Sequence, residues 1–427
     1  MISGEGGKLT DHVGLGALTR VVPRYVVDEA VARCGRQEKR SRLLPSHVVV
    51  YFVLALSLFT DGYEEVVRKL VNGLRFARVW SAVWKVPTTG ALSQARARLG
   101  VDPLRELFAM VAVPVATPAT PGAWLRELRL MAIDGVMIDM PDTPENNAEF
   151  PRPGGVRRPF PQTRVVGLSE VGTHAVIGVE IGTMRTGERE LAEGLVRLVG
   201  PGMVVVCDRG FFSFDLWRTY LATGTQLLWR ISASNRLPVL QPLADGSYLS
   251  EITNQNSRSK TRIAAADVDD ITLATHIPVR VVEYRVETTD DNDSPQTETF
   301  RLVTSILDPA DATADELART YHERWEIESA FREIEIYLRQ GKGIRSKTPE
   351  LVRQELYGLF LTHYAIRAFM TEAADTVDMD PDRLSFTRTI NIIRRRITDP
   401  AAFSPRNPDN PPPARHHRNP RTNEQTT

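Results

Sequence analysis

Short apolar runs separated by polar turns fill the middle of the chain, and this pattern predicts strands. The runs are four to thirteen residues long, as is typical of strands buried in a sheet, and helical segments separate the later ones. The expected strands are 128–140, 164–171, 174–181, 203–208 and 226–231, and the expected helices are 187–199 and 213–222. A strand meander that later alternates with helices predicts an α/β fold with a mixed sheet.

Helical periodicity predicts a separate domain over residues 1–115. Residues 48–59 are apolar on every side, but about a dozen residues are too few to cross a bilayer, so they predict a buried helix. A second helix is expected over 63–74, and a short third helix ends at Gly100, a natural stop signal. No membrane association is expected.

The later part of the chain is predicted to contain a β-rich insertion at 232–309, inside a central domain at 122–375. Polar turns separate the expected strands of the insertion, which are 239–249, 271–275, 278–288 and 298–307. Three prolines between Pro114 and Pro121 indicate a linker before the central domain. A helical segment is expected at 376–399, followed by a disordered tail at 400–427 that is rich in proline and arginine.

Composition narrows the classes of protein. The 53 basic and 53 acidic residues give a net charge of zero, so any binding of nucleic acid must come from local clusters. The two cysteines, Cys34 and Cys207, form neither a disulfide framework nor a zinc-ligand spacing. We therefore expect a cytoplasmic protein without a signal peptide.

Three carboxylates occupy positions that folding could bring together. Asp134 interrupts one apolar run, Asp208 ends another, and Glu328 lies on a long amphipathic helix that begins near Thr313. Hard oxygen ligands of this kind suit a pair of magnesium ions, which can clamp an in-line phosphoryl displacement. The pattern predicts chemistry on a nucleic-acid backbone.

Polar residues follow one edge of this long helix. At 100° per residue, Tyr321, Arg324, Glu328 and Glu335 fall within roughly 60° of one another, beside an apolar stripe. A surface helix with an Arg324–Glu328 ion pair at i,i+4 is the plain alternative. The matching strand contexts of the two aspartates favour a helix edge that faces a cleft.

With these motifs in order, the chain resembles DDE transposases of the insertion element four family. The resemblance rests on AIDG around Asp134, on CDRGFFS around Asp208 and on the spacing Tyr321-x-x-Arg324-x-x-x-Glu328. It covers residues from about 125 to 370, and the helical region before them resembles the domain that precedes the catalytic domain in this family.

The resemblance implies an RNase H-like core in which Asp134, Asp208 and Glu328 bind Mg²⁺, or Mn²⁺ as a substitute, with Asp134 bridging two ions. It implies cleavage at the terminal inverted repeats of an insertion sequence, followed by attack of the freed 3′-hydroxyl on target DNA. A homodimer in the synaptic complex, associated with the bacterial nucleoid, is also implied. Tyr321 and Arg324 would contact DNA near the transposon end.

One position departs from the family signature. The family has a lysine seven residues after the glutamate, where this chain has Glu335, and a carboxylate repels a phosphate. Arg332, Arg339 or Lys342 could supply the missing positive charge. Two alternatives therefore remain open, namely a hydrolytic RNase H-like nuclease and an inactive DNA-binding copy.

Further DNA contacts are predicted outside this helix. Arg209, directly after Asp208, could contact a phosphate. Gln94, Arg96 and Arg98 on the third N-terminal helix could recognise DNA in a helix-turn-helix manner. An ordinary solvated helix face explains these three residues equally well.

Overall fold

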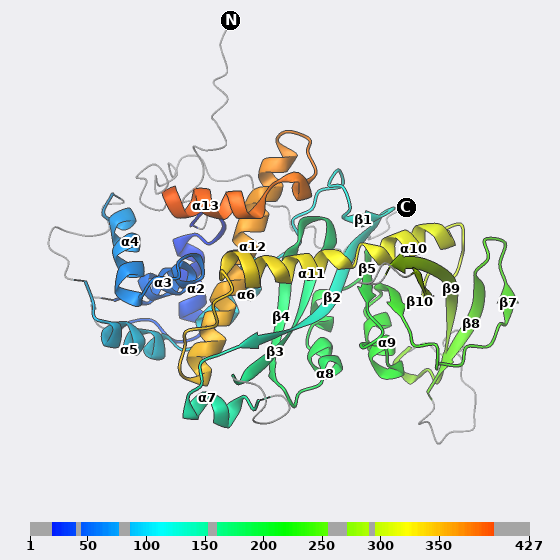
Figure 1. Cartoon of the computed structure of the whole chain (residues 1–427), viewed down its shortest axis with the longest axis horizontal. Coiled ribbons are helices and arrows are strands. Elements are labelled where there is room, and N and C mark those ends of the chain that lie inside the picture. Colours follow the sequence, from blue (N-terminus) through cyan, green and yellow to red (C-terminus); the bar gives the residue numbers. More distant parts are fainter. Residues whose placement is uncertain are drawn as a thin grey trace, which may run out of the picture.

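A mixed β-sheet organises the molecule (Figure 1). This computed structural model describes residues 19–39, 44–76, 86–152, 160–254, 271–289 and 295–396. Within them, ten strands form one sheet in the order β4-β3-β2-β5-β6-β10-β9-β8-β7, with β1 also paired to β2. The predicted tail at 400–427 lies outside the described residues.

The centre of the sheet is parallel and its flanks are antiparallel. Strands β2, β5 and β6 run parallel, β3 and β4 form the predicted hairpin beside β2, and β10 pairs with β6. The strands are β1 Trp124–Leu125, β2 Leu128–Asp139, β3 Gln162–Glu170, β4 Ala175–Thr183, β5 Met203–Cys207, β6 Gln226–Arg230, β7 Gln241–Pro242, β8 Tyr248–Thr253, β9 His276–Thr289 and β10 Pro295–Thr304. This arrangement confirms the predicted α/β fold with an RNase H-like mixed sheet.

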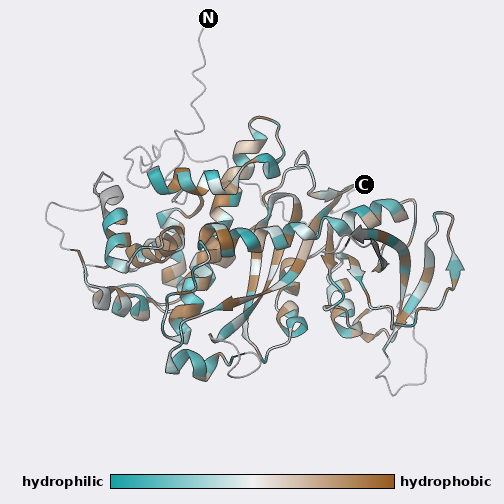
Figure 2. Cartoon of the chain, in the orientation of Figure 1, coloured by the Kyte–Doolittle hydropathy of each residue, from teal (hydrophilic) through white to brown (hydrophobic). Residues whose placement is uncertain are grey.

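Strand β5 shows why the central runs are apolar without alternation. It lies between two parallel neighbours, and Val204, Val205 and Val206 are all fully buried. A strand covered on both faces needs apolar side chains at successive positions. Hydrophobic residues accordingly follow the central strands (Figure 2).

The N-terminal helices pack around one long C-terminal helix, α12. Helix α12 contacts α3, α6 and strand β4, so one hydrophobic core runs from the N-terminal helices into the sheet. The helices of this region are α2 Arg24–Arg33, α3 Ser46–Leu58, α4 Tyr63–Phe76, α5 Thr89–Leu99, α6 Asp102–Val111, α12 Pro349–Asp375 and α13 Phe386–Arg396. Helix α3 is buried along nearly its whole length, as predicted.

No single helix among the described residues is long and apolar enough to cross a membrane. The pair formed by α3 and the first part of α4, bent by 111°, meets the criteria of length and composition only when the two helices are taken together.

The remaining helices cover the sheet. They are α7 Pro144–Glu149, α8 Glu188–Glu193, α9 Phe214–Leu221, α10 Ala314–His322 and α11 Trp325–Arg332. Helix α11 contacts β2 and β3 and lies across the central strands (Figure 1).

The predicted long helix is divided. Thr313 begins α10 with a reciprocal capping box to Glu316, as its N-cap position predicted. A turn at Glu323–Arg324 separates α10 from α11, and residues Glu333–Leu338 form a π-helix, η7. A π-helix has more residues per turn than an α-helix. The angle of 100° per residue that placed Glu335 beside Glu328 therefore does not apply beyond Arg332.

The residues predicted to form a β-rich insertion extend the same sheet, because β10 pairs with β6. Two expected strands in this region are wrong. The strand expected at 239–249 is divided into β7 and β8, which are separated by a turn where the N–H of Leu243 donates to the carbonyl of Ser247 at 2.8 Å. Residues Ile271–Leu273 form a 3₁₀-helix, closed by the N–H of Ala274 donating to the carbonyl of Ile271 at 3.2 Å. Residues 290–294, between the strands expected at 278–288 and 298–307, lie outside the described residues.

Candidate active site

Strand register places two of the predicted carboxylates side by side. Ile133 of β2 pairs with Cys207 of the parallel strand β5. Each of these two residues is followed by an aspartate, Asp134 after Ile133 and Asp208 after Cys207. Equivalent positions on neighbouring parallel strands point to the same side of a sheet. The two carboxylates therefore meet where β5 ends, at the edge where α/β sheets bind ligands.

Helix α11 and the end of α10 bring the remaining groups to these aspartates. Nη1 of Arg324 lies 3.0 Å from Oδ2 of Asp134, and Nη2 of Arg324 lies 3.1 Å from Oε1 of Glu328. The hydroxyl of Tyr321 donates to Oδ1 of Asp208 at 3.2 Å. One guanidinium thus contacts Asp134 and Glu328, and one phenol contacts Asp208. The predicted edge of Tyr321, Arg324 and Glu328 faces the sheet.

Burial sets the charges in this group. Burial raises the pKa of Asp134 to about 6, against the opposing effects of the Gly135 N–H and Arg324. Burial also raises the pKa of Tyr321 far above its usual range, so its hydroxyl stays a donor. Burial disfavours the charge on Arg324, yet Tyr321 and the carboxylates raise its pKa. Three carboxylates share one cation, and this excess of negative charge suits a divalent metal ion.

We predict that Asp134→Asn stabilises the metal-free protein at pH 7. The unfolded pKa of Asp134 is near 3.8 and the folded value is about 6, so the native state holds the extra proton between these pH values. The contribution of Asp134 to stability is therefore lost as pH rises through that window. Arg324 keeps Glu328 as a partner in the variant. The gain at pH 7 should be at most about 3 kcal/mol.

Thermal melts in chelator at pH 4 and pH 7 measure this effect. The difference in melting temperature between Asp134→Asn and the parent should be large at pH 7 and small at pH 4. Asp215→Asn, on the exposed start of α9, is the control and should change little at either pH. Equal differences at both pH values would show that the ionisation of Asp134 is not the cause.

Arg209 lies at the rim of the site. It is exposed directly after Asp208. The neighbouring loop is fixed because Nε of Arg189 donates to the carbonyl of Gly210 at 2.9 Å. Arg209 is thus an exposed cation directly after one of the three carboxylates.

The structure buries three of the predicted DNA contacts. Tyr321 and Arg324 are 2% and 6% exposed and face the carboxylates. The third is Arg96 on α5. Its side chain is fully buried and donates to Oε1 of Gln354 at 2.8 Å and to Oγ of Ser346 at 3.0 Å. Arg96 therefore joins α5 to α12 and is out of reach of DNA. Gln94 and Arg98 are exposed on the remaining faces of α5.

A charged cluster behind α11 was not predicted. Most of its groups are buried, and two of its carboxylates, Glu326 and Asp382, are partly exposed. We call it the anchor cluster, and its members are His174, Glu326, Glu333, His363, Arg367 and Asp382. Glu333 is at its centre, where Oε2 lies 3.0 Å from Nε2 of His363 and 2.8 Å from Nε of Arg367. Nδ1 of His174, from the turn between β3 and β4, lies 3.5 Å from Oε1 of Glu333.

The anchor cluster holds the helix that carries Glu328. Burial alone would raise the pKa of Glu333, but His174, His363 and Arg367 hold that pKa well below its usual range, so Glu333 stays charged. Glu326 also contacts His174. Glu328 is about 160° around α11 from Glu326, so the cluster fixes the face opposite the active site. It thereby sets the rotation of α11 and the aim of Glu328.

Three members of the anchor cluster have a spacing that a metal ion could fit. Nε2 of His174 and carboxylate oxygens of Glu326 and Asp382 lie within 4.8 Å of one another. Arg367, however, lies 3.9 Å from Oδ1 of Asp382 and also contacts His174, so a cation already balances part of this charge. The anchor cluster is separate from the carboxylates on β2, β5 and α11, which have the donor set that suits magnesium.

An RNase H-like sheet with acidic side chains converging from two central strands and a crossing helix defines the class of DDE enzymes. Residues 126–364 match the family described as Transposase DDE domain, and residues 12–109 match Insertion element 4 transposase N-terminal. The chain belongs to this insertion element 4 family of DDE transposases.

A curated relative agrees with this assignment. The chain is 29% identical over 392 residues to Transposase InsG for insertion sequence element IS4 of Escherichia coli (strain K12), over 89% of this chain and 83% of that protein. Among solved structures, a piggyBac transposase synaptic complex with hairpin DNA matches with a TM-score of 0.44 and 11% identity, over 92% of this chain and 81% of that one.

Proposed function

We propose that this transposase cleaves the ends of an insertion sequence and joins the freed 3′-hydroxyl to target DNA by metal-dependent phosphoryl transfer. The observation that supports this most is the convergence of Asp134, Asp208 and Glu328 around Arg324. The DNA partners are the terminal inverted repeats and the target. A homodimer in the synaptic complex is part of the proposal.

The three carboxylates would hold Mg²⁺, with Mn²⁺ as a substitute. Their hard oxygen donors and shared negative charge fit such ions. When bound, the ions activate the attacking hydroxyl and stabilise the leaving oxygen. Tyr321 would fix Asp208 through its hydrogen bond, and Arg324 would hold Asp134 and Glu328 beside each other.

A strand-transfer assay with precut terminal-repeat DNA tests the proposal. The protein should join the 3′-ends to a target plasmid in the presence of Mg²⁺ and not in chelator. Cleavage without joining would favour the hydrolytic nuclease. Specific binding of the repeats with neither cleavage nor joining would favour the inactive DNA-binding copy, which Glu335 makes a concrete alternative.

We predict that Glu335→Lys strengthens binding to cleaved ends. Glu335 is half-buried on η7, where burial raises its pKa and the charge of Arg339 opposes that rise. At this edge a carboxylate repels a DNA phosphate, whereas a lysine attracts it. Affinity should rise about tenfold at low salt, and the gain should shrink as salt screens the new attraction.

Binding titrations over a range of salt concentrations, together with strand-transfer yields, measure this prediction. Glu335→Gln removes the negative charge without adding a positive one and should give an intermediate affinity. Unchanged or weaker binding by Glu335→Lys would mean that this edge does not face DNA, or that a neighbouring cation already fills the role.

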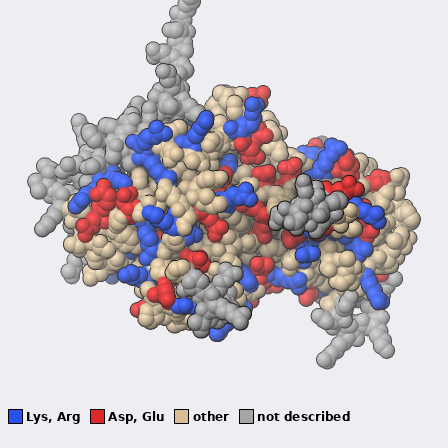
Figure 3. Space-filling model, viewed as in Figure 1, with Lys and Arg blue, Asp and Glu red and all other residues tan. Residues whose placement is uncertain are grey.

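The N-terminal helix α5 keeps a smaller part in the proposal. Gln94 and Arg98 remain candidates for DNA recognition because both are exposed. Acidic and basic side chains are interspersed over the face of the molecule shown in Figure 3. DNA binding is therefore proposed to depend on a few local groups of cations.

A further inference from the structure

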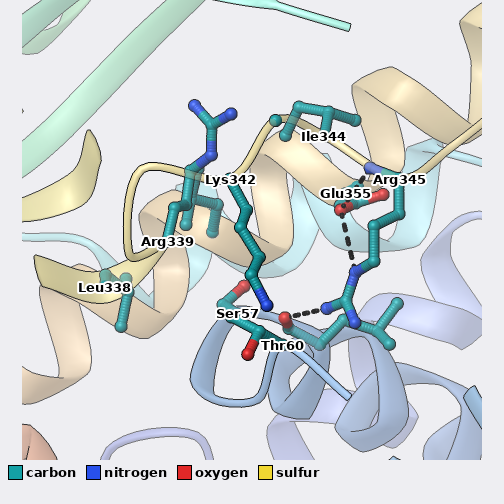
Figure 4. Close-up of a pocket in the computed structure, with 11 residues that line it drawn as sticks. Ser57, Thr60, Leu338, Arg339, Lys342, Ile344, Arg345 and Glu355 are labelled. Atoms are coloured by element: carbon teal, nitrogen blue, oxygen red, sulfur yellow. Dashed lines mark hydrogen bonds and ion pairs between the residues drawn. The ribbon is translucent and has the colours of Figure 1, made fainter. Parts of the chain in front are cut away.

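Two adjoining hollows lie where the N-terminal helices meet the segment that follows η7. The first, of about 50 Å³, is lined by Ser57 and Thr60 from one side and by Arg339 and Lys342 from the other (Figure 4). The second, of about 400 Å³, shares Thr60 and is lined by Lys69 and Arg394, among others. We call the two hollows together the seam.

The seam concentrates positive charge in a chain whose net charge is zero. Each hollow is lined by three cations and a single carboxylate. In the first these are Arg339, Lys342, Arg345 and Glu355. In the second they are Lys69, Arg394, Arg395 and Asp61. Each hollow therefore has a formal excess of two positive charges, which favours an anionic ligand.

Internal contacts already use the two carboxylates. Glu355 accepts from the backbone N–H of Arg345 at 3.1 Å, and Asp61 pairs with Nζ of Lys69 at 2.6 Å. Lys342, in contrast, is exposed, and its side chain extends toward Ser57 and Thr60 (Figure 4). Its ammonium group is placed to meet an incoming anion at the mouth of the first hollow.

Ser57 supplies an independent indication of a ligand. Its side chain is 6% exposed, and its Oγ is among the buried polar atoms without a hydrogen-bond partner in the described residues. A buried hydroxyl without a partner costs free energy, so an acceptor in this hollow would be stabilised by it. Thr60 makes one long contact of 3.5 Å to Gln340 and can donate to the same ligand.

We propose that the seam binds a phosphate of the DNA backbone. Lys342 supplies the charge, and the hydroxyls of Ser57 and Thr60 donate hydrogen bonds to the phosphate oxygens. About 50 Å³ holds roughly four water-sized atoms, enough for the oxygens of one phosphate group. The proposal rests on the proposed DNA transposase function and gives Lys342 the role that Glu335 cannot perform.

The position of the seam predicts which phosphate is bound. The helical segment from Glu328 to Leu338 spans at most about 15 Å, the length that it would have at the α-helical rise of 1.5 Å per residue. At about 3.4 Å per nucleotide, that length corresponds to four or five nucleotides. Lys342 should therefore contact a phosphate within about five nucleotides of the cleavage point.

Terminal-repeat duplexes with a single neutral methylphosphonate at each of the first ten positions test the proposal. With the parent protein, one substitution near the fifth nucleotide should weaken binding about tenfold. With Lys342→Ala that substitution should have no further effect, and the salt slope should fall by about one unit. Lys342→Arg should restore both. Lys347→Ala, which removes an exposed lysine five residues further along, is the matched control.

The outcomes separate the two proposals. If the parent joins DNA ends but Lys342→Ala keeps the parental affinity, slope and methylphosphonate pattern, the seam proposal alone is overturned. If Lys342→Ala shows the expected losses but the parent never cleaves or joins DNA, the seam stands and the transposition activity fails. If the parent binds no DNA at all, both proposals fail. Ser57→Ala should weaken binding to a smaller degree than Lys342→Ala.

Discussion

Asp134→Ala, Asp208→Ala and Glu328→Ala should each reduce DNA cleavage by on the order of a thousandfold or more, with the fold intact. Each change removes one of three carboxylates that meet beside Arg324, and the remaining pair cannot hold the metal charge that phosphoryl transfer requires. Cleavage of labelled terminal-repeat DNA in Mg²⁺ measures the loss. Circular dichroism and thermal melts check that the variants are folded.

Two comparisons make this prediction specific. Asp142→Ala removes an exposed carboxylate that follows β2 and should leave the rate close to that of the parent. Asp208→Cys replaces a hard oxygen ligand by a softer one and should recover partial cleavage with Mn²⁺ but not with Mg²⁺. Near-parental cleavage by any one alanine variant in Mg²⁺ would remove that residue from the metal site.

Sequence patterns predicted the part of the site that follows from local periodicity. Asp134 and Asp208 were placed by apolar runs that a carboxylate interrupts or ends, and the parallel register of β2 and β5 brings them together. The i,i+4 pair of Arg324 and Glu328 was expected as the plain alternative, and it is present. The same guanidinium also contacts Asp134, so Arg324 belongs both to the i,i+4 ion pair and to the helix edge that faces the carboxylates.

The rest depends on tertiary contacts that spacing cannot show. Arg96 resembles a solvated cation on an isolated helix, but Gln354 and Ser346 of a distant segment enclose it. The pairing of His174 with Glu333 joins residues far apart in the chain. Nothing in the sequence identified Glu333 or its partners.

The π-helix is a second limit on prediction from periodicity. The wheel that placed Glu335 beside Glu328 assumed regular α-helix, whereas η7 begins at Glu333. Glu335 still lies near Arg339 and near Asp139, which is the last residue of β2. The binding titration with Glu335→Lys therefore tests whether this residue faces DNA.

The largest expected loss of stability follows from Glu333→Gln. Glu333 is buried and contacts His363 and Arg367, so the neutral variant leaves the Arg367 guanidinium without its closest charged partner. Breaking a buried ion pair from one side costs about 3–5 kcal/mol, because the remaining charge stays desolvated. Urea denaturation of the metal-free protein should show this loss as a lower midpoint with an unchanged slope.

A double-variant cycle distinguishes this explanation from general damage to the core. Arg367→Met alone should also destabilise the protein, but Glu333→Gln combined with Arg367→Met should cost much less than the two single changes together. Glu326→Gln, whose side chain is 29% exposed, should have the smaller effect of a partly solvated pair. Additive losses in the cycle would show that Glu333 and Arg367 do not stabilise the protein as a pair.

Because the anchor cluster sets the rotation of α11, Glu333→Gln should also weaken Mn²⁺ binding, measured by electron paramagnetic resonance, under conditions where the variant is folded. Parental Mn²⁺ affinity in the folded variant would show that the cluster does not position Glu328.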